Sequence, residues 1–389
     1  KLAIMRGAGR PLREDLWINL ALGPRATDLL GAPKVRTLDS SFDRGMRPSM
    51  TGDPTTRTLA NGEPNPSHRD HWLVGSPRTP CDVLLIFAHD SDVESMALPV
   101  IAQFSSLLDS RPTYEELGQL LPGEIEHFGF RDGISQPGVL GRVVVNGEER
   151  FIATRYGVPS QGDIRFGKPG EPLVWPGQFL TGQPTFSGDE AALEAEFTNG
   201  SFLVFRRLKQ DVRAFVSDTA AIARSLSEAT GTKLSAEEFR ARIVGRFRSG
   251  ISLMRHATEP VGTEGPLEIN YFAFGAELPD FQLSDGAQVR GSHADPDVLR
   301  GRRCPAWAHT RKVNPRDLGT DRGGVAETLG FQMLRRGIPF GPLYNCLDEM
   351  APGDATSRGL LFVAYQRKID DQFGTLNRGW MNNRNAPAA

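Results

Sequence analysis

Apolar residues along the chain form short blocks, and the blocks differ in their spacing. Continuous apolar runs of strand length occur at residues 17–22 (WINLAL), 82–88 (DVLLIFA), 201–208 (SFLVFRRL) and 360–365 (LLFVAY). Apolar residues at helical spacing occupy other stretches, so strands and helices do not alternate regularly. This pattern predicts the α+β class.

Four helices are expected between and after these strands. The first follows Asp90 or Ser91, either of which can cap it. Ser235 and Glu238 form a capping-box pattern for the third, and the fourth is a short helix near 369–377. The apolar faces expected are Val93, Met96, Val100, Ile101, Phe104, Leu107 and Leu108 for the first helix, Val212, Phe215, Thr219, Ile222 and Leu226 for the second, and Phe239, Ile243 and Phe247 for the third.

The mixture of strands and helices occurs twice, which predicts two domains of similar kind. We expect an N-terminal domain over 1–150, a connection rich in Gly and Pro over 151–198, and a C-terminal domain over 199–389. Residues 24–80 are rich in Pro, Gly, Arg and Asp and show little periodicity. They are therefore predicted to be long loop excursions on the first domain.

The net charge and the composition limit the classes of binding partner that we expect. The 389 residues include 45 Lys and Arg against 47 Asp and Glu, so neither nucleic acid nor an anionic membrane is favoured. No apolar run approaches the roughly 18 residues of a membrane span, which predicts a soluble protein. The N-terminal KLAIMRGAGR lacks the apolar core of a signal peptide, so a trimmed chain is expected, and both a cytoplasmic and a secreted location stay open. Oligomeric state also stays open.

Common catalytic and metal motifs do not occur in the sequence. The three cysteines are odd in number and widely spaced, unlike a disulfide framework or a thiolate metal site. His68 and His71 have a metal-binding spacing but lie in a Pro-rich loop without a third ligand. HExxH, GxSxG, P-loop and dinucleotide-binding patterns are missing, which removes the usual support for hydrolase, kinase and dehydrogenase functions.

His309 stands in a basic stretch, RGRRCPAWAHTRKVNPRD (300–317). Surrounding cations disfavour the imidazolium and keep the ring in the neutral form that binds a metal. The same cations, Arg316 among them, can hold carboxylates, and a porphyrin offers both an iron and propionates. The alternative is a solvated basic loop with an incidental histidine.

Two further residues suggest chemistry. Asp132 lies in HFGFRDGISQPG (127–138), between phenylalanines and glycines, where it is either a turn residue or a group placed beside a ligand. Arg335 follows an apolar segment in FQMLRRGIPFGP (331–342), with glycines and prolines that stiffen the backbone after it. It either reaches into a cavity or forms an ordinary ion pair.

Together these stretches resemble the DyP-type (dye-decolorizing) peroxidases. GFRDG (129–133) is similar to that family's GxxDG signature, AHTRKVNPR (308–316) to its proximal-histidine stretch, and MLRRGIPFG (333–341) to its distal-arginine stretch, in the same order. The resemblance runs from about residue 80 to the C-terminus. GRFRSG (245–250) departs in having Phe247 where relatives often carry Trp, and residues 24–80 match nothing in the family, which leaves the subclass and the substrate channel open.

The resemblance implies an α+β fold of two ferredoxin-like domains with antiparallel sheets and peripheral helices. These domains would hold haem b (iron protoporphyrin IX), with His309 as the axial ligand of the iron. The resemblance places Asp132 and Arg335 on the opposite, distal face, and Leu360 and Phe362 along the distal pocket. The implied reaction uses H2O2 to oxidise dyes, phenolics or other small aromatic reductants in one-electron steps. The reductant itself is not indicated.

The implied peroxidase reaction gives each of these residues a role. Asp132 would accept and return the proton of peroxide, and Arg335 would stabilise the negative charge that develops as the O–O bond breaks. An aspartate stays ionised at a pH that would protonate a histidine, so turnover is expected to be best on the acid side of neutral. Asp370 or Asp371 is the expected acceptor for the other N–H of the axial imidazole.

Trp380 has two interpretations, an electron relay for bulky dyes or a structural residue that packs the terminal helix. The function also has alternatives. One is a haem-binding or haem-handling protein with incidental peroxidase activity, which needs the axial ligand but no distal acid and base. Another is a haem-free hydrolase with an Asp-His site.

Overall fold

The computed structural model describes the chain in segments and divides it into two compact units, residues 1–116 and 117–389. The domain limits expected from the sequence, at 150 and 198, imply a different division and stay a prediction. Much of the expected connection, 151–168 and 186–196, lies outside the described residues. The described residues are 16–47, 51–53, 55–65, 67–139, 143–145, 148–150, 169–185, 197–260, 265, 268–282, 286, 288–344 and 357–386.

The first unit contains a two-stranded antiparallel sheet. Strands β1 (Trp17–Leu22) and β2 (Val83–Ala88) pair along their whole length, which confirms both predicted strands. Helix α5 (Val93–Leu107) follows β2, and its cap is Asp92, whose carboxylate accepts the backbone N–H of Ser95. The prediction of Asp90 or Ser91 as the cap was therefore wrong by one or two positions.

The segment 24–44 corrects another prediction, because it is largely helical. The side chain of Asp39 accepts two backbone N–H groups at the start of the third of its helices, and a proline begins the first. Helices this short are held by their ends and show no apolar period, which is why the sequence suggested loops. They are α1 (Pro24–Leu29), α2 (Val35–Leu38) and α3 (Ser40–Arg44); η1 (Arg69–His71) follows in the loop beyond.

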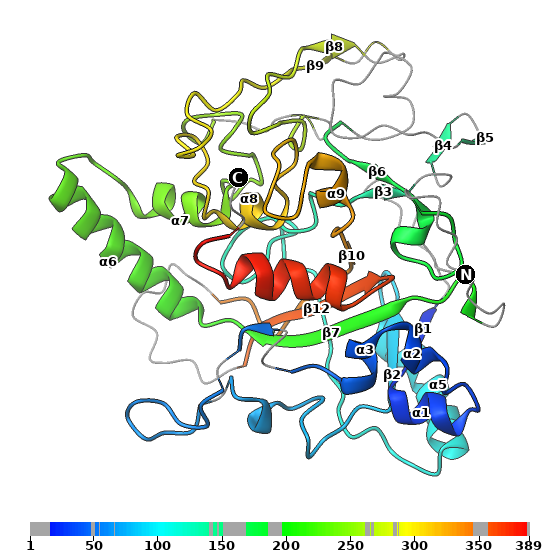
Figure 1. Ribbon diagram of the computed structural model, residues 1–389. Helices are drawn as coiled ribbons and strands as arrows, with labels where there is room; N and C mark the ends of the chain where they lie inside the picture. The colour runs from blue at the N-terminus through cyan, green and yellow to red at the C-terminus, as the bar shows by residue number, and fades with distance from the viewer. Residues whose placement is uncertain are drawn as a thin grey trace. The chain divides into compact units, whose positions relative to one another are not determined.

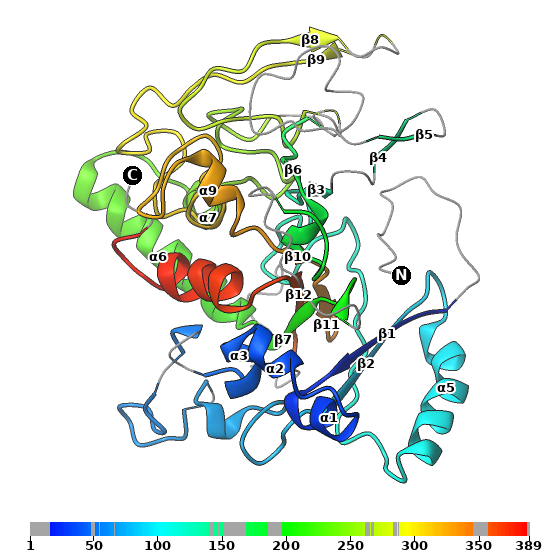
Figure 2. The same ribbon diagram turned by 45° about the vertical axis from the view of Figure 1, so that its right-hand side comes forward.

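The second unit is organised around a four-stranded antiparallel sheet (Figure 1). Strand β12 (Gly359–Gln366) lies at its centre, paired on one side with β7 (Phe202–Lys209) over its full length. On the other side it pairs with β10 (Leu334–Arg335) and β11 (Ile338–Phe340). The C-terminal helix η5 (Asp370–Met381), red in Figures 1 and 2, is a π-helix that follows β12 after a short turn.

Smaller strand pairs lie in the rest of this unit, joined by long irregular segments. With the central sheet they make an arrangement of antiparallel strands and separate helices, so the predicted α+β class is confirmed. The pairs are β3 (Gly138–Val139) with β6 (Leu173–Val174), which are parallel, β4 (Val143–Val145) with β5 (Glu148–Arg150), and β8 (Phe281–Gln282) with β9 (Gln288–Val289); η3 (Pro176–Gln178) follows β6.

Helices α6 (Val212–Thr230) and α7 (Ala236–Val244) pack against each other. The predicted capping box at the start of α7 is confirmed, with reciprocal bonds between Ser235 and Glu238. The buried positions of α6 are Val212, Thr219 and Ala223, whereas Ile222 and Leu226 are exposed. That part of the expected apolar face was wrong, because the packing stripe of α6 uses small residues.

The end of α7 meets α8 (His309–Val313), the helix that begins with the candidate ligand. Gly245 ends α7 in a left-handed conformation with φ of 92°, and a Cβ there would collide with the Thr310 side chain. An apolar core in this unit includes Phe247, Met254 and Phe274. Within the described segments, no helix combines the length and the apolar character that crossing a bilayer requires.

Two helix-ending glycines offer a matched test of this contact. Gly231 also has a left-handed φ, of 67°, but a Cβ there meets nothing within 4 Å. Gly231→Ala should cost only the backbone strain, about 1–2 kcal/mol. Gly245→Ala adds a steric clash of about 1–3 kcal/mol. Urea unfolding measures both, and equal losses in the two variants would show that α7 and α8 are not closely packed.

Candidate functional site

The segment that carries Asp132 is held in place by a buried carboxylate. Glu126 accepts the backbone N–H groups of Phe128 and Phe130, each at 3.0 Å, and a hydrogen bond from Gln210 of the loop after β7. Burial raises the pKa of Glu126, and the nearby Asp132 adds to that rise, against the opposing effect of the hydrogen bonds it accepts. A buried carboxyl therefore fixes the backbone just before the GFRDG motif.

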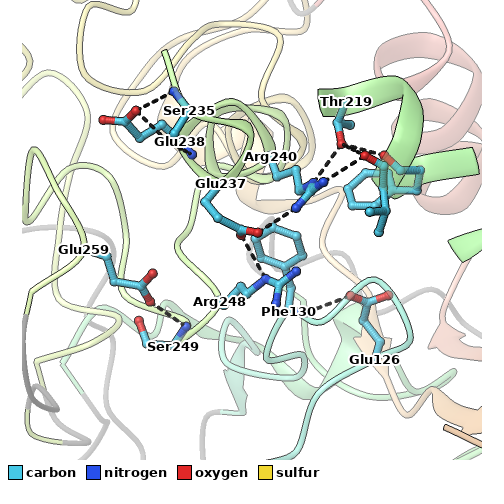
Figure 3. Close-up of polar contacts among 12 residues, drawn as sticks. Glu126, Phe130, Thr219, Ser235, Glu237, Glu238, Arg240, Arg248, Ser249 and Glu259 are labelled. Atoms are coloured by element: carbon cyan, nitrogen blue, oxygen red, sulfur yellow. Dashed lines mark hydrogen bonds and ion pairs between the residues drawn. The ribbon is translucent and has the colours of Figure 1, made fainter. Parts of the chain in front are cut away.

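The other side of the motif rests on α7 and the residues after it (Figure 3). Glu237 lies between the guanidinium groups of Arg240 and Arg248, at 2.6 Å and 3.0 Å. A Cβ on Gly129 would sit 3.4 Å from the guanidinium carbon of Arg248, and Gly129 has a φ of 90°. Only glycine suits this position, because the backbone is left-handed and lies close to a fixed side chain.

Asp132 itself is exposed. Its backbone N–H donates to the Glu124 carbonyl at 3.2 Å, and its Oδ1 accepts the N–H of Gly133 at 2.7 Å. One carboxylate oxygen thus fixes the side chain to its own turn. Oδ2 has no hydrogen-bond partner among the described residues, so an outside ligand can reach it.

Arg335 belongs to the central sheet, and the register of the sheet decides which residues accompany it. It lies opposite Ala364 of β12, and directly opposed residues project from the same face. Side chains alternate along a strand, so Leu360 and Phe362 project from that face as well. Both are half-buried, whereas the intervening Leu361 is buried. The sheet therefore places Arg335, Leu360 and Phe362 on one face, and their assigned roles stay predictions.

Positive charge is concentrated beside this face. Arg335 donates to the Ser135 carbonyl at 2.7 Å, while Arg246 and Arg316 donate to the Ser135 hydroxyl at 2.8 and 3.4 Å. The last two also share the Asn270 side-chain oxygen. The pKa of Arg246 is lowered to about 9, chiefly by burial and also by the charges of Arg316 and Arg335.

Backbone carbonyl groups accept many of the hydrogen bonds that this cluster of arginines donates. Arg316 donates to the carbonyls of Asn270 and Phe272, at 3.1 and 2.8 Å, and lies over the Phe272 ring. Arg246 and Arg335 form no ion pair within the described residues. The expected role of Arg316 toward a carboxylate of a cofactor stays a prediction, and the structure adds Arg246 as a second buried cation beside it.

The His309 side chain has accessible surface although many protein atoms surround it. Its side chain is exposed, yet burial by surrounding protein atoms is the largest cause that lowers its pKa. The Arg335 charge lowers the pKa further and the Asp132 charge opposes it, so both groups lie within electrostatic range of the imidazole. The three residues predicted from separate motifs therefore share one region.

The lowered pKa agrees with the expectation of a neutral ring, but its cause differs. The neighbours of His309 in the sequence were expected to supply the positive charge, whereas their side chains bind elsewhere. Arg311 donates to the Cys304 carbonyl at 2.8 Å, and Lys312 donates to the Asn383 carbonyl at 2.7 Å, just beyond η5. The cation that acts on the imidazole is Arg335, from a distant part of the chain.

Other candidates are placed less favourably. Asp371 is exposed and forms a 3.6 Å ion pair with Lys368, and the expected bond from the axial imidazole to Asp370 or Asp371 stays a prediction. Trp380 is 1% exposed, packs edge-on against Phe331 and donates to Asp321 at 3.0 Å. This environment supports the structural interpretation of Trp380.

The residues present fit a porphyrin. In the described part of the chain no three His, Cys, Asp or Glu side chains are grouped as metal ligands, His68 and His71 included. A single neutral imidazole suits a metal whose other ligands come from a cofactor. Buried guanidinium groups suit carboxylates, and Leu360 and Phe362 offer apolar contacts to a ring. Sequence reasoning missed Ser135, Asn270 and Arg246, although Ser135 and Arg246 stand in motifs already quoted.

Known proteins are similar to this chain over much of its length. Residues 185–387, just over half of the chain, match the family model "Dyp-type peroxidase, C-terminal". The dye-decolorizing peroxidase msp1 of Mycetinis scorodonius is 29% identical over 89% of this chain and 59% of its own. The curated relatives matched are longer proteins, of which this chain spans less than two thirds.

Solved structures are similar over nearly the whole chain. A decolorizing peroxidase from Auricularia auricula-judae superposes with a TM-score of 0.67 at 25% identity, over 97% of this chain and 73% of that one. A dye-decolorizing peroxidase in complex with 2,6-dimethoxyphenol gives 0.65 at 27% identity, over 99% and 75%. The fold is thus the α+β fold of these proteins.

The buried carboxylate of Glu126 leads to a pH prediction. Its folded pKa is raised, so its protonation stabilises the fold fully below the ordinary value of 4.5 and that contribution is lost as pH rises through the folded pKa. The melting temperature of the wild type should therefore rise relative to Glu126→Gln as pH falls from about 7 toward 4.5. A difference that does not change with pH would show that Glu126 is not buried in this way.

Proposed function

This chain belongs to the Dyp-type peroxidase family, and we propose that it is a haem b peroxidase that uses H2O2 to oxidise aromatic reductants in one-electron steps. His309 would bind the iron, Asp132 and Arg335 would act on peroxide, and Arg316 with Arg246 would face the carboxylates of the cofactor. Leu360 and Phe362 would line the distal side.

One observation carries the proposal. Burial lowers the pKa of the His309 imidazole, and the two charged groups that act on it are Arg335, which lowers the pKa further, and Asp132, which raises it. Haem, when bound, supplies an iron that takes an imidazole ligand and exchanges single electrons. A ligand, a carboxylate and a cation grouped in this way supply what a peroxidase needs from its protein.

The two distal groups have distinct tasks. The Asp132 carboxylate accepts a proton from the inner oxygen of peroxide and returns it to the outer oxygen, which leaves as water. Its Oδ1 is held by Gly133, so Oδ2 is the oxygen that can carry this proton. The Arg335 guanidinium offers N–H groups to the negative charge on the departing oxygen. Arg335 stays in place because Ser135 and the sheet register hold it.

Small aromatic molecules are the proposed reductants. The relative solved with 2,6-dimethoxyphenol supports a phenolic substrate for this chain. The net charge of −2 gives the whole chain no strong preference for the charge of its partner. The expectation that turnover is best on the acid side of neutral accompanies this proposal, and a pH-rate profile checks it.

Storage or transport of haem is the second candidate function, and Asp132 separates the two. A carrier needs the imidazole and the buried cations, but it has no use for an exposed carboxylate on a turn held by Glu126, Gly129 and Arg248. The elaborate support of the GFRDG motif therefore favours the peroxidase.

Stopped-flow absorption of the haem-loaded chain with one equivalent of H2O2 tests the distal roles. The peroxide-dependent spectral change should be fast in wild type and at least ~100-fold slower in Arg335→Leu and in Asp132→Asn, because each removes a group that acts in the transition state. Arg131→Leu is the matched control. It removes an exposed guanidinium from the same loop, where Arg131 pairs with Glu124, and its rate should stay within about threefold.

Equal rates in all four proteins would contradict the peroxidase assignment and favour the carrier. The axial role has its own readout. His309→Ala should weaken haem binding and alter the Soret spectrum, and added imidazole should restore the wild-type spectrum. A His309→Ala protein with an unchanged spectrum would remove His309 from the site.

A further inference from the structure

The side chain of Asn270 lies between two of the buried arginines. It is 5% exposed, and its Oδ1 accepts hydrogen bonds from the Ser135 hydroxyl at 2.8 Å, from Arg246 at 2.9 Å and from Arg316 at 2.5 Å. A guanidinium group only donates hydrogen bonds, so the oxygen of the amide must face the arginines. The amide nitrogen donates to the Gly170 carbonyl at 3.1 Å. Both polar atoms of Asn270 are thus engaged within the protein.

The acceptor that the two arginines share is neutral. Buried charges in proteins are normally paired with an opposite charge. Burial is the main cause that lowers the pKa of Arg246, and the charges of Arg316 and Arg335 add to it. Among the residues that the structure describes, no carboxylate forms an ion pair with Arg246. The amide of Asn270 therefore satisfies hydrogen bonds of the guanidinium group but leaves its charge uncompensated.

The backbone at Arg316 indicates that the place of this side chain matters. Arg316 has a φ of 56°, a left-handed conformation that is unfavourable for a residue with a Cβ. The following carboxylate, of Asp317, holds the segment by accepting three consecutive backbone N–H groups at 2.7–2.8 Å, those of Phe274, Gly275 and Ala276. Strained residues that are held by their surroundings in this way occur preferentially at ligand sites.

An aspartate in place of Asn270 would have nearly the same size and a different effect. It would supply a negative charge as well as an acceptor, and each guanidinium would form a charge-assisted hydrogen bond with it. The positive charge of the two arginines would then be offset from within the chain. The amide leaves that attraction available to a ligand.

We propose that Asn270 is a positioning residue, which holds Arg246 and Arg316 with a neutral acceptor and so keeps their positive charge available for the carboxylates of the cofactor. The inference rests on the proposed function, which supplies the cofactor. It adds a residue that acts through the two arginines and favours a ligand with free carboxylates over one whose carboxylates are blocked.

Esterified haem separates this role from a purely structural one. Binding of haem and of haem dimethyl ester, whose two propionates are uncharged, is measured by titration of the full chain followed by Soret absorption. Wild type should bind haem about tenfold or more tightly than the ester, because only haem carries anions that offset the arginines. Asn270→Asp should weaken haem binding by about the same factor and change ester binding less than about threefold.

Asn65→Asp is the matched control. Asn65 is also 5% exposed, accepts the backbone N–H of Ser67 at 3.1 Å and donates to the Thr56 carbonyl at 3.2 Å. The substitution therefore loses one donated hydrogen bond and introduces a carboxylate, as Asn270→Asp does. The preference of Asn65→Asp for haem over the ester should stay within about twofold of wild type, because the two arginines and their shared acceptor are unchanged.

Urea unfolding of the haem-free chain gives a second readout. Asn270→Asp should unfold at a urea concentration equal to or above that of wild type, since the introduced charge offsets those of two buried arginines. Asn65→Asp should unfold at a lower concentration, because its carboxylate faces the Thr56 carbonyl. Equal destabilisation in the two variants would show that the charges of the arginines are already offset within the chain, which contradicts the inference.

The wild type alone can also overturn the inference. Equal affinity for haem and for haem dimethyl ester would do so even if Asn270→Asp does not fold. A preference for haem in Asn270→Asp that stays within about twofold of wild type would overturn it as well, and would leave the peroxidase proposal standing. If the wild type binds neither compound, the proposed function fails and the inference fails with it.

Discussion

Three guanidinium groups meet at Ser135, and this concentration of positive charge is the constraint on which the site depends. Arg246 and Arg316 are buried, and Arg335 is half-buried beside them. Their mutual repulsion would expel them from a protein interior unless carbonyl oxygens or an anion offset it. Burial is the main cause of the lowered pKa of Arg246, and the charges of Arg316 and Arg335 add to it. A bound group with carboxylates would relieve the repulsion, so the cluster favours an anionic cofactor before any metal is considered.

The surrounding structure explains how such a cluster persists. Arg246 donates hydrogen bonds to the backbone carbonyls of Gly250 and Ile269. Arg316 donates to those of Asn270 and Phe272. Carbonyl groups in irregular segments thus take the place of water around both guanidinium groups. Long loops are useful here because their carbonyls are not taken up by a helix or sheet ladder. Burial is the largest cause of the lowered pKa of His309, and the Arg335 charge adds to it, which links the cation cluster to the proposed metal ligand.

Much of this site follows from local sequence. Asp132, His309 and Arg335 each stand in a motif whose residue types indicate chemistry, and the strands at 17–22 and 360–365 have apolar runs of strand length. The short helices of 24–44 escaped prediction, because caps such as Asp39 rather than an apolar period hold them. The exposed Ile222 and Leu226 were misplaced, since helical spacing alone does not tell which stripe packs when Ala223 and Thr219 form the contact.

Contacts between distant segments could not be predicted. Nothing in the sequence around Asn270 indicates that its side chain accepts hydrogen bonds from Arg246 and Arg316. The positive charge that lowers the pKa of His309 was expected from its neighbours in the sequence, whereas it comes from Arg335. These partners are set by the sheet register and by loop paths, which depend on the whole fold. The buried location of Trp380 belongs to the same class of information.

The most direct measurement is a crystal structure of the full chain loaded with haem and treated with cyanide, a small ligand of the iron. Our account predicts His309 bound to the iron on one face, cyanide on the other within reach of Asp132 and Arg335, and the propionates beside Arg246 and Arg316. Haem bound by another histidine, or with Asp132 and Arg335 away from the cyanide, would contradict it.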